Sequence, residues 1–420
     1  MKKVLIGIVV LFSFLLLTTL YSQKLTIEFW HAMGGGHGEA LKQIVESFNS
    51  LNPDIEVKAV YVGNYSALLQ KLLASAQGGT LPVLSQSYSN WTSKLLKGGY
   101  IEDLTPYIND PLIGFSKEEW EDIFEPFRKM VTWDDKVYAL PFNKSTYLMF
   151  INTDALDLEG LEIPKTMDEL IEVAKILTQD FDGDGTVDQY GLGIRPTVDT
   201  FQIFLRANGG KIYDEKTGEV TVNSPEAKEA LQLMVDLVHK YKAAYMQGGY
   251  LSGPFGDGKV AIYFGSTAGM PYVESACKGK HAWTWAPIPK WKTYAPPFAG
   301  TDVVMFSTAK LEEKKAAWKF MKFLVSQDIT TFWAIKTGYM PVRKSALETK
   351  AWKSFVKNSP LLAVPVEQIP YGSIDPKPAQ WNEIRGAVST AVSNALHQKM
   401  TVEEALEWAE KEIKRILSEE

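Results

Sequence analysis

Apolar and polar residues alternate with two different periods along the chain, and these periods predict strands that alternate with helices. Residues 24–30 and 55–62 alternate with period two, which is typical of strands with one buried face. Between them, Leu41, Ile44 and Phe48 recur at helical spacing, and an Asn-Pro pair ends that helix. The order strand, helix, strand predicts an α/β fold, mostly of parallel sheets with helices on both faces.

Sequence signals mark where further helices begin. Thr166 with Glu169, and Thr401 with Glu404, have the spacing of a capping box, in which two side chains satisfy backbone N–H groups of the first turn. Ser224 precedes a proline at the first helical position. The closing helix carries an apolar stripe at Leu406, Ala409, Ile413 and Ile416.

The first residues have the pattern of a secretory signal. Two lysines precede an apolar run over 4–20, and polar residues follow at Ser22 and Gln23. We expect cleavage after Ser22 or Gln23, so that 1–23 is the signal peptide. An uncleaved anchor is the alternative, because the run approaches the length that spans a bilayer. Since no cysteine lies near the cleavage region, we expect a soluble protein outside the cytoplasm, periplasmic or extracellular, and not a lipoprotein.

Length, charge and cysteine content narrow the function classes. A chain of 420 residues is longer than one ordinary domain and predicts two or three. The net charge is −6 with both signs interspersed, so the chain has no positive stripe with which to bind nucleic acid. The single Cys277 excludes an internal disulfide framework and a thiolate-rich metal site.

An aspartate-rich stretch, DFDGDGTVDQYG, has the spacing of a calcium loop. Asp180, Asp182 and Asp184 occupy its first three ligand positions, and Asp188 occupies the ninth. The bidentate glutamate of an EF-hand is missing, because Gly191 stands there. The alternative is a turn whose carboxylates accept backbone N–H groups. Both interpretations stay open, and calcium in a bracing role is the one cofactor that the sequence suggests.

Motifs for catalysis are absent from the sequence. The stretch HAMGGGHG lacks the Gly-Lys-Ser/Thr of phosphate loops, and His31 and His37 have no third metal ligand nearby. The chain contains neither Gly-x-Ser-x-Gly nor His-Glu-x-x-His. Twelve tryptophans, among them Trp283 and Trp285, suit sugar stacking as well as core packing. The residues favour binding over catalysis, although counting does not exclude the paired acids of a glycoside hydrolase.

Several stretches follow one another in an order that is typical of one protein family. They are TIEFWHAM, FNSLNPDIEV, LPFNKSTYLMFINTDAL, DGDGTVDQYG, AAWKFMKFLVSQ and KTGYMPVR. These stretches extend over essentially the whole chain. On them the protein resembles the extracellular solute-binding proteins of ABC importers, in the maltose-binding-protein-like class. On FWHAM, YVGNY, PFNKST and EIRGAV it is most similar to the members that bind sn-glycerol 3-phosphate and its diesters.

The resemblance implies a two-lobe periplasmic-binding-protein fold with a hinge and an interlobe cleft. The chain would cross between the lobes three times, with an N-terminal lobe of residues 24–138 and 292–338 and a C-terminal lobe of 139–291 and 339–420. Ligand contacts from both lobes would favour the closed form, which the membrane permease then recognises.

Positions of ligand contact in the glycerol-phosphate members can be carried over to this chain. Six hold the residue type that the family has there: Tyr65, Ser145, Ser266, Gly300, Tyr339 and Arg385. Two positions depart, because Ser89 replaces an acid that receives glycerol hydroxyls and Met167 replaces a tryptophan. The resemblance therefore implies that the phosphate side of the site is kept and the glycerol side is altered.

The function implied by the resemblance is a periplasmic receptor for sn-glycerol 3-phosphate, or for a related phosphorylated polyol or glycerophosphodiester, that delivers its ligand to a permease and is not an enzyme. One arginine with tyrosine and serine hydroxyls supplies the directed donors that a phosphoryl group needs. Without the resemblance, Arg385 is a surface arginine in an ion pair. The alternatives are an oligosaccharide ligand, supported by Ser89 and Met167, and a secreted glycoside hydrolase.

Overall fold

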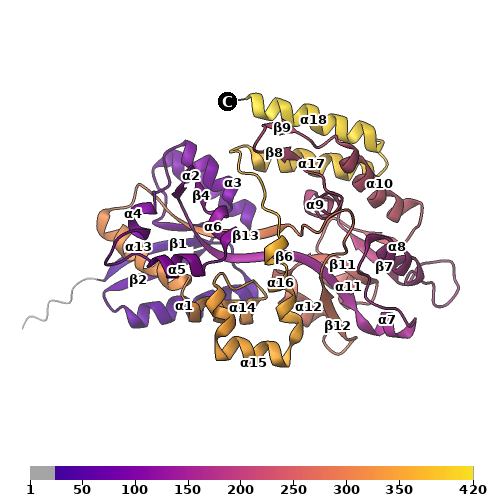
Figure 1. Cartoon of the computed structure of the whole chain (residues 1–420), viewed down its shortest axis with the longest axis horizontal. Coiled ribbons are helices and arrows are strands. Elements are labelled where there is room, and N and C mark those ends of the chain that lie inside the picture. The colour runs from indigo at the N-terminus through magenta and orange to yellow at the C-terminus, as the bar shows by residue number, and fades with distance from the viewer. Residues whose placement is uncertain (1–23, 420) are drawn as a thin grey trace, which may run out of the picture.

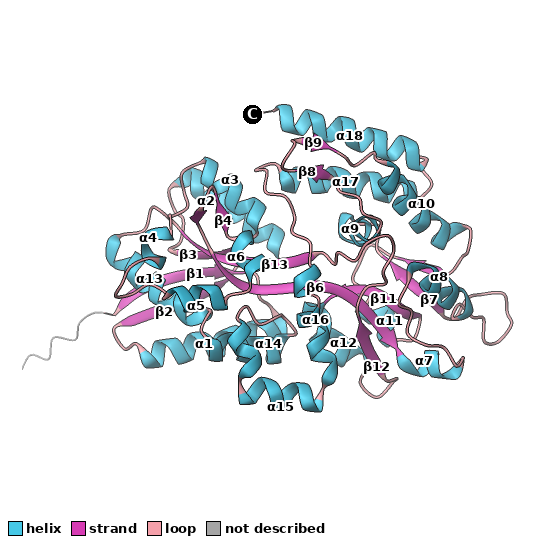
Figure 2. Ribbon diagram, in the orientation of Figure 1, coloured by secondary structure: helices cyan, strands magenta, loops and turns pink. Residues whose placement is uncertain are grey.

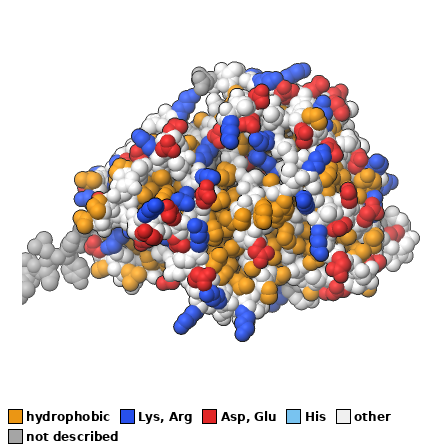
Figure 3. Space-filling view, viewed as in Figure 1, with side chains coloured by type: hydrophobic (Ala, Val, Ile, Leu, Met, Phe, Trp, Pro, Cys, Tyr) orange, Lys and Arg blue, Asp and Glu red, His pale blue; other side chains and the backbone are white. Residues whose placement is uncertain are grey.

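The computed structural model describes residues 24–419, which form two lobes side by side (Figure 1). The predicted signal peptide, 1–23, lies outside the described residues. Within the described part of the chain, no helix has the length and apolar character needed to cross a bilayer. Lys and Arg side chains are interspersed with Asp and Glu over the face seen in Figure 3, and hydrophobic side chains gather across its middle.

One mixed sheet runs through both lobes, in the strand order β10-β7-β11-β6-β13-β3-β1-β2, with β12 paired to β6. The first lobe contributes β1 (Leu25–His31), β2 (Ile55–Tyr61) and β3 (Leu84–Ser87). The second lobe contributes β7 (Tyr190–Ile194), β10 (Ala244–Met246), β11 (Val260–Ser266) and β12 (Trp283–Ala286). The strands β6 (Leu140–Asn152) and β13 (Phe298–Met305) lie between them and connect the lobes.

The predicted two-lobe α/β fold is confirmed, but the sheet is less parallel than the sequence pattern suggested. Within each lobe, β1 pairs in parallel with β2 and β3, and β7 with β10 and β11. In contrast, β6 and β13 run antiparallel to each other and to their outer neighbours β11, β12 and β3. The chain passes out and back between the lobes through these two strands, so they run in opposite directions.

Helices cover both faces of the sheet (Figure 2). Those of the first lobe are α1 (Gly35–Leu51), α2 (Tyr65–Gly78), α3 (Ser89–Lys97), α4 (Thr105–Ile108), α5 (Lys117–Asp122), α6 (Glu125–Met130), α13 (Leu311–Leu324) and α14 (Gln327–Thr337). Those of the second are α7 (Thr153–Leu158), α8 (Met167–Ile176), α9 (Val198–Ala207), α10 (Pro225–His239), α11 (Ser252–Gly256), α12 (Met270–Cys277), α17 (Trp381–Leu396) and α18 (Val402–Ser418). The segment between α14 and α17 holds α15 (Lys350–Asn358) and α16 (Val364–Glu367). Two short hairpins complete the fold: β4 (Thr132–Trp133) with β5 (Lys136–Val137), and β8 (Tyr213–Asp214) with β9 (Glu219–Val220).

The hydrophobic cores show which elements pack together, while the predicted lobe boundaries stay a prediction. Within β6, Phe142 packs in the first core and Met149 in the second, so the passage between lobes lies inside this strand. After residue 338, Met340 and Ile369 still pack in the first core, whereas Trp381 packs in the second. Part of the segment 339–380 therefore packs with the first lobe, before the chain joins the second core at Trp381.

The predicted helix starts are confirmed. Thr166 with Glu169 begins α8 and Thr401 with Glu404 begins α18, both as complete capping boxes. The hydroxyl of Ser224 accepts the N–H of the third residue of α10, whose first residue is proline. These local signals acted as predicted because they satisfy N–H groups that have no partner inside the helix.

We expect Thr401→Ala to lower the free energy of unfolding by about 1 kcal/mol. The Thr401 hydroxyl accepts the N–H of Glu404 at 3.2 Å, and the Glu404 carboxylate accepts the N–H of Thr401 at 2.9 Å. Alanine removes the first bond and keeps the second, because residue 401 retains its backbone N–H. Chemical denaturation measures the difference, with Thr401→Ser as the control that keeps the hydroxyl. Equal losses in the two variants would contradict a capping role.

Candidate functional site

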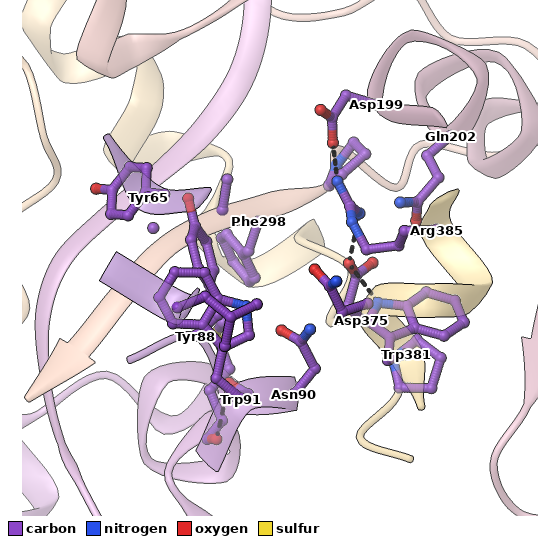
Figure 4. A pocket seen from close by; sticks show the side chains of 18 of the residues that line it. Tyr65, Tyr88, Asn90, Trp91, Asp199, Gln202, Phe298, Asp375, Trp381 and Arg385 are labelled. Atoms are coloured by element: carbon purple, nitrogen blue, oxygen red, sulfur yellow. Dashed lines mark hydrogen bonds and ion pairs between the residues drawn. The ribbon is translucent and has the colours of Figure 1, made fainter. Parts of the chain in front are cut away.

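A cavity of about 610 Å³ lies between the two lobes. The first lobe lines it with residues of α2, α3 and β13, and the second lobe with residues of α9, α17 and the loop before α17. Figure 4 shows side chains from both lobes facing one another across it. Its volume falls within the range of about 300–1,000 Å³ that is typical of small-molecule sites.

Four of the predicted ligand contacts line this cavity: Tyr65, Ser89, Gly300 and Arg385. Tyr65 and Ser89 are the first residues of α2 and α3, where each helix follows a strand of the first lobe. Arg385 lies on α17 in the second lobe. Segments more than 300 residues apart in the sequence therefore meet at one site.

The other three predicted contacts do not line the cavity, and a ligand-binding role for them stays a prediction. Ser145 is buried within β6, and the Ser266 hydroxyl accepts the N–H of Ala268 at 3.3 Å. Tyr339 is buried and its hydroxyl is hydrogen-bonded to that of Tyr65. Met167 is only 1% exposed and packs in the second core, so it is not in the cavity wall.

Two carboxylates hold the guanidinium of Arg385 (Figure 4). One of its nitrogens donates to Asp375 at 3.0 Å, and another donates to Asp199. Burial acts to lower the pKa of Arg385, but Asp199 and Asp375 outweigh this and raise its pKa above the ordinary value. Arg385 is the one cation among the described residues that line the cavity, and each of its two terminal nitrogens already donates to a carboxylate.

Asp375 is the centre of the polar network on this wall. Besides Arg385, it accepts the indole N–H of Trp381 at 3.0 Å, and Arg206 approaches it to 4.0 Å. With its amide oriented to suit both neighbours, Gln202 donates to Asp375 and accepts from Arg385, each at 2.9 Å. Two carboxylates and two guanidinium groups therefore balance one another.

Aromatic rings form much of the remaining wall. In the first lobe, Tyr88 packs edge-on against Tyr65 and Trp91, with ring centroids 5.0 and 4.9 Å apart. Across the cavity the second lobe presents Tyr147 and Trp381. Burial raises the pKa of the cavity tyrosines, so their hydroxyls stay protonated and can donate. Flat apolar faces beside hydrogen-bonding groups are the surface that a carbohydrate requires.

The two crossing strands carry a buried ion pair and a glycine beside the cavity. Lys144 on β6 lies 2.5 Å from Asp302 on β13, and neither side chain is exposed. Gly300 on β13 has φ +96°, and a Cβ there would lie 1.8 Å from the carbonyl oxygen of Asn143. The Asn143 amide donates to the Tyr65 hydroxyl at 3.1 Å. The spacing of β6 and β13 therefore determines where a cavity tyrosine stands.

The aspartate loop does not contribute to the cavity, and its calcium site stays a prediction. Ligand oxygens of Asp180, Asp182 and Asp188 lie within 4.8 Å of one another, as a cation would need. Asp184 stands apart and accepts the N–H of Thr186 at 2.6 Å. The carboxylate of Asp180 accepts two backbone N–H groups of the loop, which is the arrangement that the alternative of a plain turn predicts.

The histidines of the HAMGGGHG loop are packing residues. His31 and His37 are both buried, and burial lowers the pKa of each, that of His31 to about 4. Among residues 24–419, the one group of three potential metal ligands is the aspartate cluster. Neither histidine therefore belongs to a multi-residue metal site within this range.

Sequence reasoning missed the residues that set the charge and the shape of the cavity. Asp199 and Asp375 were not singled out, and Tyr88 and Trp91 were passed over although they lie directly after β3. Trp381 was also not singled out; it is almost completely buried, and one edge of it lines the cavity. The cluster of aromatic and polar residues in SYSNW, at the carboxyl end of a strand, was the signal that could have revealed this wall.

Comparison with known families decides the class of protein. The family described as bacterial extracellular solute-binding protein matches residues 43–360. The chain belongs to this family. It is a solute-binding protein of an ABC transporter and not an enzyme, as the sequence predicted, and the family implies membrane permease subunits as partners.

Individual relatives of the solute-binding protein bind different kinds of ligand. It is 26% identical to the sn-glycerol-3-phosphate-binding periplasmic protein UgpB of Yersinia pestis, over 82% of this chain and 80% of that protein. It is 24% identical to a maltotriose-binding protein of Pyrococcus abyssi, over 88% of this chain and 78% of that protein.

The solved structures that resemble this chain also hold two different kinds of ligand. UgpB from Mycobacterium tuberculosis in complex with glycerophosphocholine has a TM-score of 0.82 at 20% identity, covering 93% of this chain and 98% of that one. The acarbose-binding GacH receptor of Streptomyces glaucescens has a TM-score of 0.82 at 21% identity, covering 94% and 99%. At these identities the structures show the shared fold alone, and the ligand has to be argued from the cavity.

Proposed function

We propose that this solute-binding protein is the receptor of an importer for a neutral carbohydrate, which it binds in the interlobe cavity. The observation that carries the proposal is the pairing of Arg385 with both Asp199 and Asp375. The charge of this cation is already neutralised by two carboxylates, so it attracts a second anion only weakly. The carboxylates remain able to accept hydrogen bonds from sugar hydroxyls.

A phosphoryl ligand would find no net positive charge at this wall. Its attraction to Arg385 would be offset by repulsion from Asp199 and Asp375, because like and opposite charges at similar distances contribute about equally. A neutral polyol has no such penalty. Its hydroxyls donate to the carboxylates, and its apolar faces stack on Tyr147 and on the first-lobe tyrosines.

A phosphorylated polyol or glycerophosphodiester is the second candidate. It is favoured by Arg385 in the cavity wall and by the similarity to UgpB. The phosphoryl oxygens of this ligand would compete with Asp199 and Asp375 for the guanidinium as the lobes close. The two candidates therefore make opposite demands on Asp375.

Titration calorimetry of residues 24–420 with maltotriose, cellotriose and sn-glycerol 3-phosphate tests the proposal. We expect heat with a neutral trisaccharide and none with the phosphate ester. Asp375→Asn should weaken trisaccharide binding about tenfold or more, because a hydrogen bond to a charged acceptor is lost. Asp257→Asn, at a surface pair with Lys280, is the matched control and should bind as the unaltered protein does.

The opposite pattern would overturn the proposal. Silence with both trisaccharides, together with glycerol 3-phosphate binding that Arg385→Ala abolishes and Asp375→Asn strengthens, would identify a phosphate receptor. The increase in Asp375→Asn is the informative result, because removal of one carboxylate would free a donor face of the guanidinium for phosphate.

A further inference from the structure

The residues directly before α17, 375–380, form a strap that runs between the two lobes (Figure 1). Polar contacts fasten the strap to the second lobe. The carboxylate of Asp375 pairs with Arg385 on α17, and the backbone N–H of Lys377 donates to the carboxylate of Glu215, in the turn between β8 and β9, at 3.0 Å. We therefore expect the strap to move with the second lobe when the lobes separate.

The side chain of Lys377 reaches across to the first lobe. Its ammonium donates to the carbonyl oxygens of Lys129 and Thr132, each at 2.6 Å. It also lies 4.2 Å from the centre of the Trp133 ring. That ring is held from behind, because its indole N–H donates to the Ser93 hydroxyl on α3 at 2.8 Å. The end of α6, β4 and α3 therefore form one seat for the lysine.

The ammonium in this seat carries a charge at neutral pH. Burial lowers the pKa of Lys377 to about 8, Glu215 and Asp302 oppose this decrease, and Lys144 adds to it. A charged group that leaves water needs partners in exchange, and two carbonyl oxygens with an aromatic face supply them. Hydrogen bonds from a charged donor are stronger than those between neutral groups.

A second polar contact between the lobes is more exposed. Lys94 on α3 pairs with Glu383 on α17, and each of these side chains is 40% exposed. Exposed ion pairs contribute little, because water and salt screen them. We therefore expect Lys377 to be the stronger of the two contacts.

We propose that Lys377 is a latch, which holds the lobes together in the closed form without touching the ligand. Lys377 is not among the residues that line the cavity. Its strap belongs to the second lobe and its seat to the first, so separation of the lobes breaks every contact of the ammonium. The latch therefore favours closure before any ligand arrives. The inference holds for a sugar and for a phosphate ester alike.

Double electron–electron resonance on the ligand-free protein, residues 24–420, tests the latch. Nitroxide labels at Gln77→Cys on α2 and Glu407→Cys on α18 report the distance between the lobes, because both positions are exposed and lie in different lobes. The one native cysteine, Cys277, is buried. We expect the unaltered latch to give a population at the shorter, closed distance without ligand.

Two substitutions of the latch should differ in their effect. Lys377→Met keeps the length of the side chain and removes its donors, so the ratio of closed to open molecules should fall about tenfold or more. Lys377→Arg should keep most of the closed population, because a guanidinium can donate to both carbonyl oxygens and lie on the Trp133 ring. Rescue by arginine separates the latch from a simple loss of packing.

Lys314→Met is the matched control. Lys314 is a partly buried lysine that donates to Glu102 at 2.8 Å, and both residues belong to the first lobe. This variant should leave the ratio unchanged, and Lys94→Met should lower it only about twofold.

Three results would each overturn the latch. They are a ligand-free protein that shows only the open distance, a Lys377→Met variant with the closed share of the unaltered protein, and a Lys314→Met variant that loses as much as Lys377→Met. The proposed function stands in all three cases, because no ligand takes part in the measurement.

Discussion

Lys144→Ala is expected to lower the free energy of unfolding by about 3–5 kcal/mol, the loss typical of a buried charge left without its partner. Lys144 and Asp302 are both 0% exposed, and they join the two strands that connect the lobes. Alanine leaves the Asp302 carboxyl buried next to an empty volume. Urea denaturation of both proteins measures the loss.

The loss should depend on pH in a defined direction. Burial raises the pKa of the Asp302 carboxyl, and the Lys144 ammonium opposes this rise. Removing Lys144 therefore raises the pKa further in the folded variant. A carboxyl whose folded pKa is raised contributes stability below its unfolded pKa and loses it as the pH rises through the folded pKa. Lys144→Ala should thus be closest to the unaltered protein at acidic pH.

Two further variants separate the buried charge from other causes. Lys117→Ala removes an exposed partner of Glu121 and should change stability by no more than about 0.5 kcal/mol. Lys144→Met/Asp302→Leu replaces the whole pair with apolar side chains and should recover most of the loss. A loss in Lys144→Ala no greater than that of Lys117→Ala would refute this account.

Gly300→Ala is expected to cost about 2–4 kcal/mol of stability and to weaken ligand binding in the protein that remains folded. Alanine is strained at φ +96°, and its Cβ would lie 1.8 Å from the carbonyl oxygen of Asn143. The two crossing strands must move apart to admit it. Since Asn143 also holds the hydroxyl of Tyr65, the shift reaches the cavity wall.

A second glycine separates backbone strain from steric overlap. Gly279 has φ +73°, but a Cβ there would have no atom within 4 Å. Gly279→Ala should therefore cost only about 1 kcal/mol and leave binding unchanged. Denaturation and calorimetry of both variants make the comparison. If Gly300→Ala is as stable as Gly279→Ala and differs only in affinity, Gly300 serves the ligand rather than the strand pairing.

Local features of the fold could be predicted from the sequence, and long-range ones could not. Each capping box, at Thr166 and at Thr401, joins two residues that are only three positions apart, so a short stretch of sequence is enough to reveal it. The antiparallel course of β6 and β13 was not predicted, because alternation along a strand carries no information on the direction of its neighbour. It follows from a chain that leaves the first lobe and later returns.

The cavity shows the same division. Tyr65, Ser89, Gly300 and Arg385 were found through family resemblance, and all four line it. Asp199, which helps to neutralise the charge of Arg385, lies 186 residues away from it in the sequence. No local pattern distinguishes an acid that pairs with a cavity arginine from one that faces solvent. The charge balance of the site is therefore a property of the folded chain.

Because one sheet runs through both lobes, the connection between them should resist proteolytic cleavage. Proteolysis concentrates on exposed, flexible connections, whereas β6 is buried along almost its whole length and hydrogen-bonded on both edges. A protease outside the cell thus finds no exposed tether between the lobes at this strand. Because β13 and the segment before α17 also connect the lobes, one nick elsewhere would leave both halves attached.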